Sequence, residues 1–124
     1  MKQMLLLVAL SLSTLAQANT HVVYIGDSHS VGTFGETINQ WLRSRKEIAF
    51  TFSASGGTAP LQWLNGIAPL KCWLQDTETS SSAPKGQCLP PGTNSTRSTP
   101  KFSSLLRSYD PEKDANETRI VIIA

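Results

Sequence analysis

The stretch of sequence that decides the fold is HVVYIGDS, residues 21–28. Residues 21–25 form a short, mostly apolar and β-branched run that ends at Gly26, a pattern typical of a strand buried on both faces in a parallel sheet. In open α/β sheets, ligands bind outside the carboxyl ends of the strands. We therefore expect Asp27 and Ser28 to lie at the edge of the sheet where such a site forms.

The residues that follow alternate between helical and extended patterns. Residues 33–45 predict a helix with one apolar stripe, formed by Ile38, Trp41 and Leu42 at i, i+3 and i+4 spacing. Residues 48–52 predict a second strand, and residues 53–58 a glycine-containing turn. Pro60 suits the first position of a short helix, whose expected buried contacts are three apolar residues: Leu61, Leu64 and Ile67.

The composition changes between residues 71 and 100. This segment is rich in Ser, Thr, Pro and Gly and shows neither helical nor strand periodicity, so we expect a long irregular insertion. Beyond it we expect a short helix over 102–109, a polar turn over 110–117 and a buried strand over 119–124. The order strand, helix, strand, helix, insertion, strand predicts an α/β sheet with right-handed crossovers.

The N-terminus has the three parts of a secretory signal peptide. Lys2 precedes an apolar run over residues 4–10, and Ala16-Gln17-Ala18 offers small residues at the two positions that a signal peptidase reads. The run is too short to span a bilayer, which takes about 20 apolar residues. We predict cleavage after Ala18, a mature chain of residues 19–124, and a secreted or periplasmic location.

The charge of the chain argues against two classes of partner. The chain has 11 Lys and Arg and 9 Asp and Glu. Cleavage would remove one of these charges, Lys2, and leave ten basic against nine acidic residues, a net charge of +1. These charges are scattered, which argues against an electrostatic binder of nucleic acid or of anionic membranes. No second apolar segment is long enough to cross a membrane, and the length suits one domain or part of one.

Cys72 and Cys88 are the only cysteines. In an exported chain a pair at this spacing indicates a disulfide, with free thiols as the alternative. A disulfide that closes a loop of this length stabilises the folded state by about 3 kcal/mol in the chain-entropy model. Two thiolates without nearby histidines cannot fill a tetrahedral zinc site, so we expect no metal.

The tripeptide Gly26-Asp27-Ser28 has two interpretations. In the first it is a strand-to-helix loop in which Asp27 or Ser28 caps the helix. In the second it resembles the first motif of the SGNH hydrolases, also called GDSL esterases, in which the serine is the nucleophile. The resemblance implies a three-layer, flavodoxin-like open parallel sheet, with Ser28 as the catalytic nucleophile and with Gly26 and Asp27 supporting the motif.

A second segment, Ser55-Gly56-Gly57-Thr58, resembles the family's second motif. There a glycine N–H joins the N–H of the nucleophile in the oxyanion hole, a role that the resemblance places on Gly56, with Gly57 as the alternate. Such donors stabilise the negative oxygen of a tetrahedral intermediate, and glycine permits a close approach of backbone to ligand. Taken by itself, the segment is also compatible with a simple turn.

Two further motifs of the family are not found. One is a Gly-x-Asn-Asp segment directly after a later strand, and residues 120–124 resemble that strand. The other is an Asp-x-x-His that supplies the base. His21 is expected at the far end of the first strand, roughly 20 Å of extended chain from Ser28. His29 is adjacent to Ser28 with its side chain directed away, so we expect it to line the pocket or to cap the helix. The chain is therefore expected to be the N-terminal part of an SGNH-like domain, inactive by itself because it lacks the base.

These patterns predict an exported serine esterase that cleaves small-molecule acyl esters or O-acetyl groups on carbohydrate, without metal or organic cofactor. Two alternatives remain at this stage. One is a non-catalytic extracytoplasmic binding protein that keeps an SGNH-like sheet. The other is a flavodoxin-like domain with an anion site at the Ser28 loop.

Overall fold

The computed structural model of the chain describes residues 20–67, 70–106 and 115–124. The predicted signal peptide, residues 1–18, lies outside the described residues. So do residues 107–114, which contain the end of the helix expected over 102–109 and the first part of the turn expected over 110–117.

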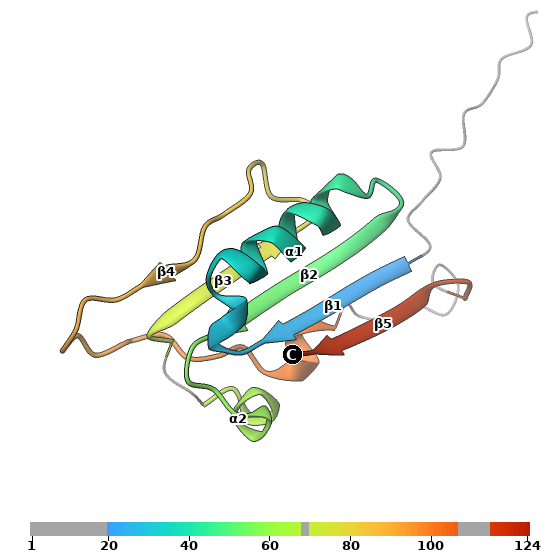
Figure 1. Cartoon of the computed structure of the whole chain (residues 1–124). Coiled ribbons are helices and arrows are strands. Elements are labelled where there is room, and N and C mark those ends of the chain that lie inside the picture. The colour runs from blue at the N-terminus through green and yellow to red at the C-terminus, as the bar shows by residue number, and fades with distance from the viewer. Residues whose placement is uncertain (1–19, 68–69, 107–114) are drawn as a thin grey trace, which may run out of the picture.

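Five strands form one sheet in the order β4-β3-β2-β1-β5, which Figure 1 shows. β1 pairs in parallel with both β2 and β5, whereas β2–β3 and β3–β4 are antiparallel pairs. The prediction of an α/β fold is confirmed, and the prediction of an all-parallel sheet is wrong. The strands are β1 (Thr20–Gly26), β2 (Ile48–Ser55), β3 (Cys72–Thr77), β4 (Gln87–Cys88) and β5 (Thr118–Ile123).

The helices lie on both faces of this sheet, with α1 on one side and α2 and α3 on the other (Figure 1). Their bounds are α1 (Thr33–Ser44), α2 (Pro60–Asn65) and α3 (Phe102–Leu105), and a 3-10 turn, η1 (Ser28–Ser30), connects β1 to α1. The expected helices therefore exist, but only α1 has more than two turns.

Two apolar clusters form the core, one on each face of the sheet. Alternate residues of a strand point to opposite faces, so Val22 and Tyr24 pack toward α1 while Val23 and Ile25 pack toward α2 and α3. On the α1 side, the rings of Tyr24 and Phe52 stack with their centroids 4.4 Å apart. Burial of each such side chain contributes about 1.5–3 kcal/mol to the stability of the fold. A shift of one residue in the strand pairing would turn these side chains to the other face, so their burial fixes the register beneath the candidate site.

The apolar residues of α1 and α2 are less buried than their spacing predicts. Of the large apolar residues of α1 only Leu42 is fully buried, while Trp41 is 50% exposed and lies beneath the guanidinium of Arg45. In α2 the buried residue is Trp63, and the three expected contacts, Leu61, Leu64 and Ile67, are exposed. A helix of six residues presents one short face to the sheet, and the large indole occupies it.

The segment expected to be an irregular insertion contains β3 and β4, so that expectation is wrong for residues 72–77 and 87–88. β3 alternates: Leu74 and Asp76 are buried toward α1, while their neighbours are half-buried. Asp76 accepts hydrogen bonds from Asn39 Nδ2 and Arg43 Nη1 of α1, each at 2.8 Å. A carboxylate buried in this way is compensated by a partner cation and a neutral donor.

β5 differs from the expectation of a strand covered on both faces. Ile120, Val121 and Ile122 are 40–43% exposed and Ile123 is 65% exposed, because β5 is the last strand of the described sheet and α1 lies over β2 and β3 (Figure 1).

Candidate functional site

Ser28 lies in η1, directly after the carboxyl end of β1, and is exposed. The loop is tied to the neighbouring strand, because the Asp27 N–H donates to the Ala124 carbonyl at 3.0 Å and the Ala124 N–H donates to the Ile25 carbonyl at 2.9 Å. The ends of β1 and β5 therefore meet at one edge of the sheet, as the sequence predicts for a site of this fold class.

A glycine at position 26 is required by the tightness of this turn. A methyl group placed on Gly26 would lie 2.2 Å from Ser30 Cβ and 2.9 Å from the Tyr24 ring. Ser30 is buried there and its Oγ is 2.9 Å from the Tyr24 hydroxyl, in a hydrogen bond beneath the loop. The turn thus folds Ser30 back onto the end of β1 and leaves Ser28 at the surface. Neither Tyr24 nor Ser30 was identified from the sequence.

Asp27 is the N-cap of η1. Its carboxylate accepts the His29 N–H at 2.9 Å, and this backbone hydrogen bond is the main reason that the pKa of Asp27 lies below its ordinary value. The His29 ring contributes too, with Nδ1 3.5 Å from the same carboxylate. The capping interpretation therefore describes Asp27 correctly, and it is compatible with a nucleophilic Ser28.

Neither histidine is placed as a base for Ser28. The His29 side chain is 86% exposed and faces Asp27. His21 is fully buried at the opposite end of β1, where Nε2 is 3.1 Å from Thr51 Oγ1 and Nδ1 is 3.9 Å from Glu117. Among the described residues no hydrogen bond joins the Ser28 side chain to an imidazole.

The turn after β2 lies beside the Ser28 loop. A methyl group placed on Gly56 would lie 3.8 Å from Ser28 Cβ and 3.2 Å from Cys72 Cβ. The Gly56 N–H, however, donates to the Cys72 carbonyl at 2.9 Å. Gly57 is exposed with φ +74°, and its N–H has no acceptor within the described part of the chain. Of the two glycines, Gly57 is the one with a free N–H.

The predicted disulfide is confirmed: Cys72 and Cys88 are bonded across the β3–β4 pair, where they are direct partners. The contact of this bond with the Gly56 turn was not predicted, because Cys72 and Cys88 were expected in an irregular insertion. A disulfide indicates an oxidising, extracytoplasmic environment.

A pocket of about 250 Å³ opens beside the same loop. Two of its residues, Thr58 and Trp63, are joined by a hydrogen bond from the indole N–H to Thr58 Oγ1 at 3.1 Å. The sequence placed both residues in the correct elements but gave them no role, because the three-residue spacing of Leu61, Leu64 and Ile67 favoured those side chains as the buried contacts. The lining residues are Ile25, Gly26, Asp27, Thr58, Pro60, Trp63, Ile123 and Ala124.

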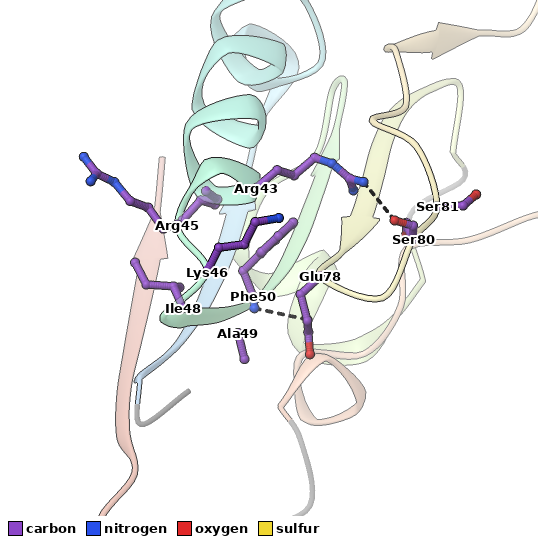
Figure 2. A pocket seen from close by; sticks show the side chains of 10 residues that line it. Arg43, Arg45, Lys46, Ile48, Ala49, Phe50, Glu78, Ser80 and Ser81 are labelled. Carbon is purple, nitrogen blue, oxygen red and sulfur yellow. Dashed lines mark hydrogen bonds between the residues drawn. The ribbon is translucent and has the colours of Figure 1, made fainter. Parts of the chain in front are cut away.

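A second pocket, of about 560 Å³, lies at the other end of β2, between the end of α1 and the connection after β3. Figure 2 shows that Arg43 reaches across it to the Ser80 carbonyl and that the Glu78 carboxylate accepts the Phe50 N–H. Because these internal contacts already satisfy Arg43 and Glu78, we place the candidate site at Ser28 instead.

Within the described ranges no three His, Cys, Asp or Glu side chains gather as metal ligands would. None of the helices in those ranges has the length and apolar content needed to cross a membrane. Comparison of the chain with protein-family models, with curated proteins and with solved structures returned no match.

Proposed function

We propose that the chain belongs to an exported serine ester hydrolase of the SGNH type, with Ser28 as the nucleophile. The observation that carries the proposal is the position of Ser28: it is exposed on a tight turn at the carboxyl end of β1, with the Gly56–Gly57 turn beside it. Side chains at such a point are accessible to a ligand and held by a rigid strand.

The proposed reaction is attack of Ser28 Oγ on the carbonyl carbon of an acyl ester. Negative charge then develops on the carbonyl oxygen, and the N–H groups of Ser28 and Gly57 are its proposed donors. Gly57 replaces Gly56 in this role because the Gly56 N–H is bonded to Cys72. Loss of one oxyanion donor costs about 10²–10³-fold in rate in serine hydrolases. Collapse of the intermediate releases the alcohol, and water hydrolyses the acyl-enzyme.

Ser28 also needs a base, because a serine hydroxyl is a weak nucleophile until its proton is removed. The chain has two histidines, and neither faces Ser28. The proposal therefore requires a base that His21 and His29 do not provide.

Export is the second part of the proposal. The pattern of residues 1–18 favours a cleaved signal peptide, and the Cys72–Cys88 disulfide suits the compartment that such a peptide leads to.

The test compares Ser28→Ala with Ser82→Ala in the protein expressed from its gene. Ser82 is an exposed serine in the loop after β3 and serves as the matched control. Covalent labelling by a fluorophosphonate and hydrolysis of a chromogenic ester are measured together with thermal unfolding. We expect Ser28→Ala to lose labelling and several orders of magnitude of turnover while it melts normally. Near-normal turnover in Ser28→Ala would exclude Ser28 as the nucleophile.

A non-catalytic binding protein is the second candidate, favoured by the lack of a histidine against Ser28. The same experiment separates the two functions, because a binding protein would show neither labelling nor turnover with Ser28 intact.

A further inference from the structure

We propose that this site takes esters of linear acyl chains of at least about six carbons, and that the chain lies in a groove between α2 and β5. The inference rests on the proposed role of Ser28, whose substrate class it names. It starts from two adjacent pockets, of about 250 and 190 Å³, whose linings share four residues and so form one groove: Ile25, Pro60, Trp63 and Ile123.

The mouth of the groove is built by the loops of the candidate site. Gly26 and Asp27, which line it, immediately precede Ser28, and Thr58 immediately follows Gly57. An ester carbonyl held at Ser28 and Gly57 therefore has its acyl chain next to this opening. Neither the smaller of the two pockets nor the pocket of about 560 Å³ is lined by residues of these loops.

The walls of the groove favour an alkyl chain over a sugar ring. Thr58 Oγ1 donates to the Ser55 carbonyl at 2.8 Å and accepts the Trp63 indole N–H, so these polar groups are already satisfied. The smaller pocket, of about 190 Å³, is farther from the Ser28 loop and is called the inner pocket. It is lined by apolar side chains only, which are the four shared residues together with Leu64 and Phe102. Sugar hydroxyls buried there would lose their hydrogen bonds to water without replacement, which disfavours carbohydrate in the groove.

The volume of the inner pocket sets a minimum for the chain length, because a chain that starts at Ser28 first passes the larger pocket at the mouth. Groups the size of a water molecule occupy about 30 Å³ each, so the inner pocket of about 190 Å³ holds roughly six of them. Each buried methylene is worth about 0.8 kcal/mol, which corresponds to an approximately fourfold gain in affinity. Acetyl esters would leave the inner pocket empty.

The experiment measures the binding of two methyl ketones, which are uncharged ester analogues that cannot be hydrolysed. We expect 2-octanone to bind about two orders of magnitude more tightly than 2-butanone, because it buries four more methylenes. The variant Leu64→Trp, which fills the inner pocket, should weaken 2-octanone binding at least tenfold. The matched control is Leu61→Trp, since Leu61 is also an exposed leucine of α2 but does not line either pocket.

The outcomes separate this inference from the proposed function. Equal binding of the two ketones, or equal losses in the Leu64→Trp and Leu61→Trp variants, overturns the acyl groove even if Ser28 is labelled by the fluorophosphonate. Chain-length-dependent binding that Leu64→Trp alone weakens supports the groove. If it occurs without labelling of Ser28, the groove stands as an alkyl-chain site and the hydrolase proposal fails.

Discussion

Gly26→Ala is expected to destabilise the protein by about 2–3 kcal/mol. The added methyl group would lie 2.2 Å from Ser30 Cβ and 2.3 Å from Ser30 Oγ, too close for either atom to remain in place. Overpacking of this kind costs about 1–3 kcal/mol. Displacing Ser30 also breaks its buried hydrogen bond to Tyr24, worth about 0.5–1.5 kcal/mol. Against these losses, alanine stabilises by about 0.4–1 kcal/mol through the unfolded state.

Gly32→Ala is the control, because a methyl group there meets nothing within 4 Å and the backbone φ of −88° suits alanine. Gly32→Ala should change the free energy of unfolding by no more than about 1 kcal/mol. Urea unfolding followed by circular dichroism measures both variants. The clash also predicts rescue: a Ser30→Gly background removes the two closest atoms and leaves only the 2.9 Å contact with the Tyr24 ring, so Gly26→Ala should cost about 1–2 kcal/mol less there. Equal costs for the two glycine variants, or additivity in the double variant, would refute the reasoning.

Three further outcomes are expected. Asp76→Asn leaves the Arg43 guanidinium without its buried carboxylate and should lower the free energy of unfolding in urea by about 3 kcal/mol. A loss below about 1 kcal/mol contradicts the buried ion pair. Peptide mass spectrometry without reduction should recover Cys72 linked to Cys88, and replacing both by serine should lower stability by about 3 kcal/mol, whereas free thiols in exported protein would exclude the bond. The pKa of Asp27 lies below the ordinary aspartate value of about 3.9, so the ionised carboxylate stabilises the folded state fully above that pH. This stabilisation disappears as the pH falls through the lowered pKa. An Asp27 carboxyl resonance that titrates at or above about 3.9 in NMR contradicts the His29 cap.

The sequence predicted the strands and the long helix that are held by apolar contacts. β1 and β5 are rich in β-branched residues, β2 begins with a short, mostly apolar run, and α1 has its apolar residues at helical spacing, so local patterns were sufficient to identify them. The same patterns placed Ser28 and the glycine turn at neighbouring strand ends, which the structure brings within contact distance.

β3 was missed because one of its buried positions is charged. Leu74 and Asp76 point to the same face, and a buried carboxylate conceals the apolar alternation by which strands are recognised. Its partners, Asn39 and Arg43, come from a helix more than 30 residues earlier, so no local pattern could reveal them. For the same reason the Gly56 N–H appeared available: its acceptor, the Cys72 carbonyl, belongs to the strand that was not predicted.

The parallel pairs of β1 have a consequence for the rate at which the chain folds. Thr20 pairs with Ile48, 28 positions away (48 − 20), and also with Thr118, 98 positions away (118 − 20). Loop-closure entropy makes the second pairing costlier by about 1 kcal/mol, and pairings of such long sequence separation are slow. β1, α1 and β2 are therefore expected to assemble first and β5 to dock last.

The Asp27 N–H, whose acceptor is the Ala124 carbonyl beyond β5, can be protected only after that docking. In pulse-labelling hydrogen exchange, the amide next to Ser28 should accordingly be among the last to gain protection. The Ser28 loop would then become ordered at the end of folding, after most of the core has formed.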